Sequence, residues 1–116
     1  EQLASRYRMA LITNGLKEVQ RPRYENSTLR PYFSGMVVSE EVGFAKPHPR
    51  IFDEAMTMMG NPRREEVLMI GDSLPADIEG ALAYGMDACW CNFGNERTDL
   101  PVHHIIHGLP QLLEFL

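Results

Sequence analysis

The stretch VLMIGDSLPADIEG, residues 67–80, constrains the fold of this chain more than any other. Its first residues, Val67–Ile70, form an unbroken apolar run, typical of a strand buried on both faces of a parallel sheet. Gly71 permits a sharp turn, and Pro75 suits the first position of a helix. Ile78, Ala81 and Leu82 then form an apolar helical stripe that Gly85 can end. The stretch therefore predicts a strand, a tight loop and a helix, the repeating unit of an α/β fold.

Two acidic residues flank the predicted loop. Asp72 follows the strand and Asp77 falls in the first helical turn, at the sheet edge where open α/β sheets bind ligands. Carboxylates that face each other repel unless a cation intervenes, and Mg²⁺ prefers one or two carboxylates plus substrate phosphate. Asp is also favoured at turns and helix starts for local reasons, so a metal site and a purely local role both stay open.

Length and composition limit the class of protein. The chain has 116 residues, enough for one modest domain, and its net charge of −5 comes without a basic run. That charge balance points neither to nucleic acid nor to an anionic membrane as a partner. No apolar run approaches the roughly 20 residues of a membrane span. Cys89 and Cys91 are interpreted as small buried hydrophobes in a reducing compartment, which indicates a cytoplasmic protein.

The remaining elements follow from apolar runs and breakers. Strands are predicted at Met9–Thr13, Gly35–Ser39, Asp87–Asn92 and His103–His107, helices at about Leu16–Leu29, Pro49–Met59 and Leu109–Leu116, and loops at Glu40–Pro49 and Asn92–Pro101. Pro22 predicts a break, a kink or a helix start at that position. In the helix that begins at Pro49, Ile51, Ala55, Met58 and Met59 are expected to face the core.

Residues Glu1–Arg8 look like the end of an earlier helix and the chain does not begin with Met, so we expect a piece of a longer protein.

Two further stretches can bind phosphate. The hydroxyl of Thr13 and the N–H groups of the Asn14-Gly15 turn follow a predicted strand, where they can hold a phosphoryl group. Lys46, in a loop made rigid by neighbouring prolines, offers a compact charge suited to phosphate oxygens. A solvated surface lysine is the alternative for Lys46, and His48 is interpreted as a loop residue rather than a catalytic base.

The ordered motifs ITNG, AKPHP and GDSLPAD closely resemble the haloacid dehalogenase-like superfamily over nearly the whole chain. The run from Ser39 to Ser73 is similar to the pyrimidine 5′-nucleotidase type. This resemblance implies a Rossmann-like parallel sheet with flanking helices. It also implies Mg²⁺-dependent hydrolysis of phosphate monoesters through an aspartyl-phosphate, with nucleoside 5′-monophosphates as the expected substrates.

The resemblance also implies a role for each polar residue. Thr13 would hydrogen-bond the transferring phosphoryl group, and Asn14 would contribute its backbone. Lys46 would neutralise the phosphoryl oxygens and the nucleophile. Asp72 would be the Mg²⁺ ligand, while Asp77 would support the metal shell or orient Lys46. A cation and donors around a spread negative charge supply most of phosphoryl-transfer catalysis.

One family motif is absent from the sequence. The DxDxT motif, which supplies the nucleophilic and the general acid/base Asp, lies in the family upstream of the ITNG strand, with the substrate-selecting cap between the two. The chain would thus be the C-terminal part of a single core domain, without the cap and without the central strand between Met9–Thr13 and Val67–Ile70. Either a missing N-terminal segment or a second chain fills that gap, by self-association across the open sheet, or the two strands pair directly.

Two classes of function remain. We favour a phosphatase as the full-length protein, with residues 1–116 alone inactive. The alternative is a non-catalytic module that binds phosphate or Mg²⁺, or that assembles with a partner. Dehalogenase chemistry is disfavoured because it needs no metal and leaves the pair Asp72 and Asp77 unexplained.

Overall fold

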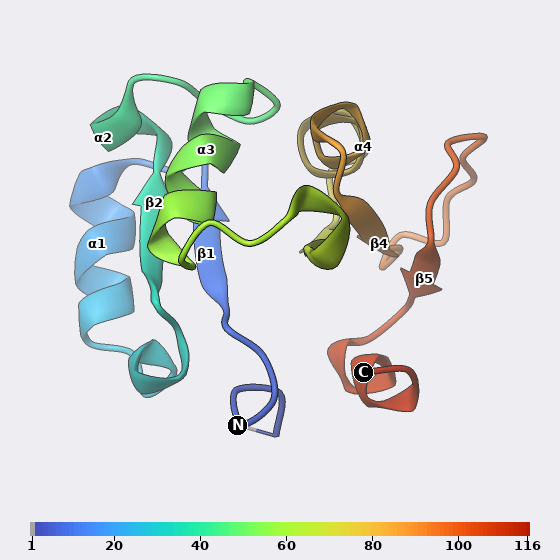
Figure 1. The fold of residues 1–116 in the computed structure, drawn as a ribbon, viewed down its shortest axis with the longest axis horizontal. Coiled ribbons are helices and arrows are strands. Elements are labelled where there is room, and N and C mark those ends of the chain that lie inside the picture. Colours follow the sequence, from blue (N-terminus) through green and yellow to red (C-terminus); the bar gives the residue numbers. More distant parts are fainter. Residues whose placement is uncertain (1) are drawn as a thin grey trace. The chain divides into compact units, whose positions relative to one another are not determined.

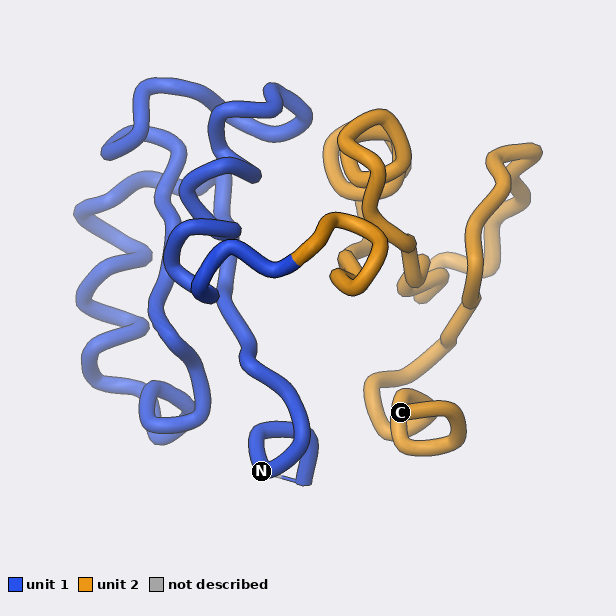
Figure 2. Tube along the Cα trace, viewed as in Figure 1, with its two compact units in different colours: residues 1–62 blue, residues 63–116 orange. Residues whose placement is uncertain are grey.

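A computed structural model describes residues 2–116 of the chain (Figure 1). The chain divides into two compact units, residues 1–62 and residues 63–116, which Figure 2 shows in different colours. Each unit has its own parallel sheet and its own helices. The expected α/β class with parallel strands and flanking helices is therefore confirmed.

The first unit is built on a two-stranded parallel sheet. Its elements are β1 (Ala10–Thr13), α1 (Lys17–Glu25), the 3₁₀ helix η1 (Arg30–Tyr32), β2 (Gly35–Val38), α2 (Ser39–Val42) and α3 (Pro49–Met58). The register pairs Ala10 with Gly35 and Thr13 with Val38. Val38 is fully buried, whereas all of β1 is only half-buried. Within the described residues β1 is thus an edge strand, with β2 as its one hydrogen-bonded neighbour.

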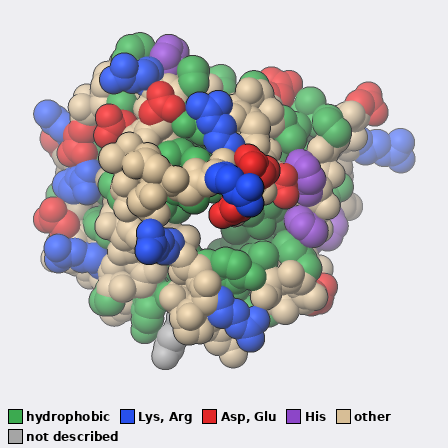
Figure 3. All heavy atoms as spheres, viewed as in Figure 1, with side chains coloured by type: hydrophobic (Ala, Val, Ile, Leu, Met, Phe, Trp, Pro, Cys, Tyr) green, Lys and Arg blue, Asp and Glu red, His purple; other side chains and the backbone are tan. Residues whose placement is uncertain are grey.

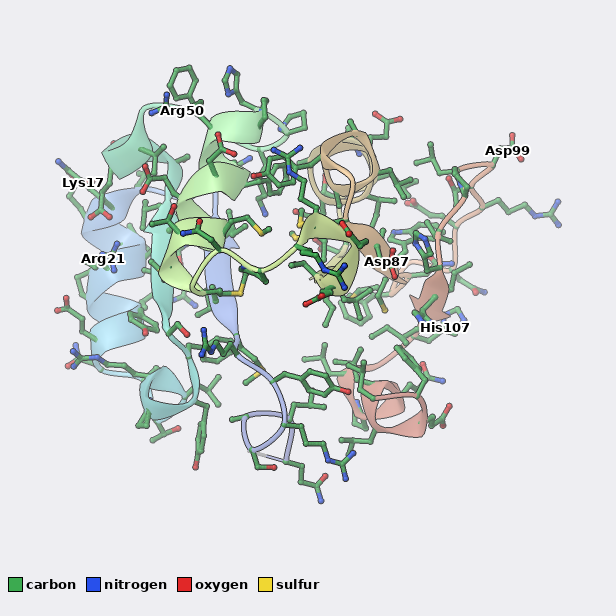
Figure 4. All side chains as sticks on the ribbon, viewed as in Figure 1. Lys17, Arg21, Arg50, Asp87, Asp99 and His107 are labelled. Atoms are coloured by element: carbon green, nitrogen blue, oxygen red, sulfur yellow. The ribbon has the colours of Figure 1, made fainter. Side chains whose placement is uncertain are left out.

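Helix α1 begins at Lys17 and runs unbroken through Pro22, so the expected break or helix start at Pro22 is wrong. Neighbouring contacts hold the middle of the helix. The guanidinium of Arg21, labelled in Figure 4, donates to the carbonyl of Met36 at 2.9 Å and pairs with the carboxylate of Glu41. These contacts offset the one backbone hydrogen bond that a proline removes. The helix ends at Glu25, before the predicted end at Leu29.

The segment predicted as a loop at Glu40–Pro49 begins with a helical turn, α2. The carboxylate of Glu40 accepts a hydrogen bond from the N–H of Lys17 at 2.8 Å, and Glu41 pairs with Arg21. These contacts with α1 hold the turn in a helical conformation. Gly43 then ends the turn at a φ of 90°, a left-handed backbone conformation that glycine adopts without steric strain. The irregular loop therefore starts only after Gly43.

Helix α3 buries a slightly different stripe from the predicted one. Ile51 and Ala55 are buried as expected, but their companions are Phe52 and Met56. Met58 is 36% exposed, so its assignment to the core is wrong. The buried face of α3 thus consists of two adjacent rows of side chains, each with a spacing of four residues. The spacing of the methionines in the sequence does not reveal this second row. Gly60, at a φ of 87°, follows the helix and confirms the predicted stop.

The N-terminal residues form turns rather than a helix. Within residues 2–8, the N–H groups of Arg6 and Tyr7 both donate to the carbonyl of Leu3, at 3.0 and 2.9 Å. These bonds close a single turn that does not continue. The predicted helix end at Glu1–Arg8 is therefore wrong for these residues, and Glu1 itself lies outside the described residues.

The second unit contains a three-stranded parallel sheet in the order β3-β4-β5. Its elements are the 3₁₀ helix η2 (Arg64–Glu66), β3 (Leu68–Gly71), the π-helical η3 (Leu74–Glu79), α4 (Gly80–Tyr84), β4 (Asp87–Cys91), β5 (His104–Ile106) and the 3₁₀ helix η4 (Leu109–Glu114). Central β4 is the buried strand, with Ala88 and Cys89 both at 0% exposure. The prediction that β3 is buried on both faces is wrong. This strand is half-buried, because among the described residues it has only β4 as a neighbour.

The helical segment after β3 largely agrees with the prediction from the sequence. The hydroxyl of Ser73 caps its start by accepting a hydrogen bond from the N–H of Ala76 at 3.2 Å. Helix η3 begins at Leu74, so Pro75 occupies its second position rather than its first. Ile78 is fully buried, and Gly85 ends α4 at a φ of 97°. Ala81 is buried as predicted and Leu82 is half-buried, so the apolar stripe is confirmed at Ile78 and Ala81, and the glycine stop is confirmed as well.

Charged side chains of both signs are interspersed over the first unit, at the left of Figure 3. Such mixing leaves no extended field of one sign on the face shown. Residues 2–116 include no helix with the length and apolar character needed to cross a lipid bilayer.

Candidate functional site

The carboxyl end of β1 carries the first group of predicted site residues. The Thr13 hydroxyl oxygen accepts a hydrogen bond from the N–H of Gly15 at 3.0 Å. That bond closes a small turn directly after the strand and fixes the rotamer of Thr13. A hydroxyl that accepts one bond keeps its own proton to donate. Thr13 can therefore offer a donor to a ligand at this edge of the sheet.

The side chain of Asn14 binds the main chain of Lys46. Its carboxamide oxygen accepts from the Lys46 N–H at 2.9 Å, and its carboxamide nitrogen donates to the Lys46 carbonyl at 3.2 Å. The carboxamide thereby bonds both the N–H and the C=O of a single residue. The resemblance implied only a backbone role for Asn14, so this side-chain contact is new information about the site.

The ammonium group of Lys46 returns to β1. Its Nζ donates to the main-chain carbonyl of Ile12 at 3.3 Å, and the side chain is half-buried. Lys46 is therefore not the fully solvated surface lysine of the alternative interpretation. The first unit thus brings Thr13, Asn14 and Lys46 together at the carboxyl end of one strand.

His48 has a local structural role in the same loop. Its Nδ1 accepts a hydrogen bond from the N–H of Arg50 at 3.1 Å, which caps the start of α3. Its ring also stacks on Phe44, with centroids 4.1 Å apart. These contacts agree with its interpretation as a loop residue.

In the second unit, Asp72 follows β3 directly, and its side chain is exposed. Its main-chain carbonyl accepts a hydrogen bond from the indole N–H of Trp90 at 3.1 Å. Trp90 belongs to β4, where it is the register partner of Gly71. The neighbouring strand therefore holds the backbone from which the Asp72 carboxylate projects.

The carboxylate of Asp77 folds back onto the same loop. Asp77 is 3% exposed, and its Oδ2 accepts from the N–H of Ser73 at 3.1 Å. It packs so tightly on Gly71 that a Cβ added there would lie 2.6 Å from the Asp77 Cβ and still closer to its carboxylate. Gly71, the last residue of β3, is thus required for the close approach of this side chain. Within its own unit, Asp77 shapes the loop that carries Asp72.

Both carboxylates act electrostatically on the end of β4. Burial raises the pKa of the Cys91 thiol, and the charges of Asp72 and Asp77 raise that pKa further. A negative charge opposes formation of a second one nearby. The two aspartates therefore concentrate negative potential at the carboxyl end of this sheet.

The chemistry of this pair fits a hard cation. Asp72 offers an exposed carboxylate, and the buried Asp77 adds negative charge behind it. Among the described residues, no group of three or more His, Cys, Asp or Glu side chains is placed to hold a metal. Mg²⁺ commonly keeps several waters and binds through one or two carboxylates plus phosphate, so a donor set of this size suits it.

Three residues of these loops were not predicted from the sequence: Trp90, Ser73 and the side-chain role of Asn14. Ser73 carried a usable signal, since Ser two residues before a helical Pro is a common start of a helix. Trp90 lies in an apolar strand with no sign of a polar role, and only the packing shows its partner.

Parallel strands with polar groups at their carboxyl ends define a ligand-binding α/β protein of the Rossmann-like class. The chain belongs to the haloacid dehalogenase-like hydrolases, whose family model matches residues 1–85.

Several relatives carry the names of phosphatases or nucleotidases. The chain is 47% identical over 85 residues to the pyrimidine 5′-nucleotidase YjjG of Escherichia coli, a match that covers 73% of this chain and 38% of that protein. It is 36% identical over 115 residues to the glyceraldehyde 3-phosphate phosphatase of Pyrococcus furiosus, covering 95% of this chain and 48% of that protein. The chain thus spans less than half the length of these relatives.

Solved structures show the same fold. The HAD-hydrolase YfnB of Bacillus subtilis bound to magnesium matches with a TM-score of 0.88 and 32% identity, over 99% of this chain and 51% of that chain. A HAD phosphatase of Thermococcus onnurineus matches with a TM-score of 0.84 and 31% identity, over 93% of this chain and 49% of that chain.

Proposed function

We propose that the full-length protein hydrolyses phosphate monoesters, with nucleoside 5′-monophosphates as substrates, in a Mg²⁺-dependent reaction through an aspartyl-phosphate. The observation that carries this proposal is the Lys46 ammonium at the carboxyl end of β1, beside the turn of Thr13. A fixed cation and a hydroxyl donor at a strand end suit the spread charge of a transferring phosphoryl group. The relatives that act on phosphorylated small molecules support the same class of substrate.

In this proposal each residue of the first unit has one task. Thr13 donates its hydroxyl proton to a phosphoryl oxygen, and Lys46 places its positive charge beside the phosphoryl oxygens. Asn14 holds the Lys46 main chain, so that the ammonium group is already in place when substrate arrives. Such preorganisation avoids the cost of reorienting charges during the reaction.

The residues of the second unit would hold the metal. Asp72 is the proposed ligand, and Asp77 supports it by fixing the Ser73 main chain. When bound, Mg²⁺ neutralises phosphoryl charge and orients the phosphate. The similar HAD-hydrolase YfnB was solved bound to magnesium, which supports this assignment.

Residues outside this sequence would supply the nucleophile. We propose that residues 1–116 are the C-terminal part of one core domain, and that an upstream segment with a DxDxT motif completes it. That segment would also provide a hydrogen-bonding neighbour for the edge strands β1 and β3. The unpaired thiols of Cys89 and Cys91 support a reducing compartment, the cytoplasm.

The decisive experiment measures phosphate release from nucleoside 5′-monophosphates by the full-length protein, with Mg²⁺ and with a chelator. Asp72→Ala should abolish the Mg²⁺-dependent activity. Asp99→Ala is the matched control, because Asp99 is an exposed carboxylate of the second unit in the loop before β5 (Figure 4). Full activity of Asp72→Ala at saturating Mg²⁺ would refute the metal assignment.

The alternative, a non-catalytic module, is tested by the same assay. Residues 1–116 without the upstream segment should release no phosphate and should self-associate through the edges of β1 and β3. A full-length protein that binds phosphate and Mg²⁺ but turns over no phosphate ester would favour the module. Turnover by residues 1–116 alone would instead show that the proposed upstream nucleophile is unnecessary.

A further inference from the structure

We propose that Trp90 is a positioning residue for the metal ligand Asp72, acting through the hydrogen bond from its indole N–H to the Asp72 main-chain carbonyl. The inference rests on the proposed function, in which Asp72 binds Mg²⁺. It assigns a polar role to a residue that composition and periodicity mark only as part of the core.

The geometry ties the indole to the loop from the neighbouring strand. Trp90 is 2% exposed, and its Nε1 lies 3.1 Å from the carbonyl oxygen of Asp72. Its register partner in the sheet is Gly71, the residue just before Asp72. The indole therefore reaches past the last paired residue of β3 and binds the first residue of the loop.

Other contacts restrain the loop on its far side. Asp77 accepts from the N–H of Ser73, and the Ser73 hydroxyl accepts from the N–H of Ala76. These bonds fix the peptide that follows Asp72 to the helical segment. Trp90 fixes the Asp72 carbonyl to β4. The peptide group between Asp72 and Ser73 is thus held at its C=O by Trp90 and at its N–H by Asp77, while the Asp72 carboxylate remains exposed.

This restraint matters for a metal because Mg²⁺ demands near-ideal ligand geometry. The direction of the Cα–Cβ bond of Asp72 follows from its backbone dihedral angles. Groups that orient a ligand without touching the metal commonly change metal affinity by 10- to 100-fold. A buried indole N–H also needs an acceptor, so the bond should persist in solution.

The test is Mg²⁺ binding by the full-length protein, measured by titration calorimetry, together with the ¹⁵N–¹H resonance of the Trp90 indole. Trp90→Phe keeps an aromatic ring but removes the donor, and it identifies the resonance. Tyr84→Phe is the matched control: Tyr84 is a buried aromatic of the same unit, its ring lies against Arg64, and it loses only a hydroxyl. Asp72→Asn reports whether the binding measured is binding at Asp72.

We expect Trp90→Phe to raise the Mg²⁺ Kd by about 10-fold and Tyr84→Phe to leave it unchanged within error. In the wild type the indole resonance should shift with added Mg²⁺ until it saturates, and the Kd from this titration should equal the calorimetric Kd. In Asp72→Asn the resonance should not shift. Because the indole N–H binds the Asp72 carbonyl, binding of Mg²⁺ by Asp72 should reach this resonance through that bond, and the measurement stands even where Trp90→Phe does not fold.

Two results overturn the inference in distinguishable ways. If the wild type binds Mg²⁺ through Asp72 but the indole resonance stays fixed and Trp90→Phe binds equally well, Trp90 has no positioning role and the proposed metal site stands. If the wild type shows no Asp72-dependent Mg²⁺ binding, the metal part of the proposed function fails and the inference fails with it.

Discussion

The carboxamide of Asn14 hydrogen-bonds both the N–H and the carbonyl of Lys46, at 2.9 and 3.2 Å. The two residues are far apart in the sequence, yet this pairing fixes the main chain from which the Lys46 side chain extends. Asn14 follows Thr13 directly in the chain. One amide therefore links the carboxyl end of β1 to the loop that carries Lys46.

Removal of the Lys46 charge should slow the reaction itself. In the full-length protein, Lys46→Met is expected to lower kcat by at least about 10²-fold, the scale of losing one contact to transition-state charge. Lys17→Met is the matched control, since Lys17 is the other lysine of the chain and is exposed on α1 (Figure 4). Steady-state kinetics separate the outcomes. A rise in KM alone would mean that Lys46 only helps to bind substrate.

Loss of the Asn14 carboxamide should have a smaller effect of the same kind. Asn14→Ala removes two hydrogen bonds to the Lys46 main chain, each of about 0.5–1.5 kcal/mol, so kcat should fall by about 10-fold. Asn14→Asp should be impaired too, because a carboxylate accepts from the Lys46 N–H but cannot donate to its carbonyl. Asn26→Ala, at an exposed helix end of the same unit, should be unaffected. Unchanged kinetics of both Asn14 variants would contradict the proposed positioning of Lys46.

A methyl group on Gly71 should disturb the Asp72 loop. Gly71→Ala places a Cβ against the buried Asp77, and overpacking of this kind costs about 1–3 kcal/mol. Urea unfolding of the full-length protein should show the loss of stability, and Mg²⁺ affinity should fall as Asp77 releases Ser73. At the control position Gly94 an added Cβ meets nothing nearer than 3.6 Å, so Gly94→Ala should be neutral. Equal stability of the two variants would contradict the close packing of Asp77 on Gly71.

The thiol of Cys89 should make the protein sensitive to alkali. Burial raises the pKa of Cys89 to about 11, whereas an unfolded thiol titrates at about 8.5. The folded state therefore favours the protonated thiol. The contribution of this group to the free energy of unfolding is fully present below the unfolded pKa. The free energy of unfolding should fall as the pH rises from about 8.5 to about 11.

Unfolding measured across this pH range should show a shallower slope for Cys89→Ala than for the wild type. At pH 8 the native protein should also react slowly with a thiol reagent at Cys89 and Cys91, both of which are buried, and should react fully once it is unfolded. Rapid native labelling at that pH would contradict the buried placement of the thiols.

Local patterns determined the elements and their order. Apolar runs located β1, β3 and β4, and glycines located the ends of α3 and α4, because these signals depend on residues adjacent in the chain. The same logic placed Thr13, Lys46 and Asp72 at strand ends or in loops. It failed at Pro22, where contacts of Arg21 with β2 and α2 outweigh a local preference.

Only the tertiary structure decided which side chains touch. The pairing of Asn14 with Lys46 and that of Trp90 with Asp72 each join segments that parallel strands and their crossover connections bring together. The direction of a side chain across such a connection depends on packing and register, and no periodicity in the sequence records it. The sequence therefore determined which chemical groups are present at the strand ends, and the packed sheets determined which backbone groups hold them in place.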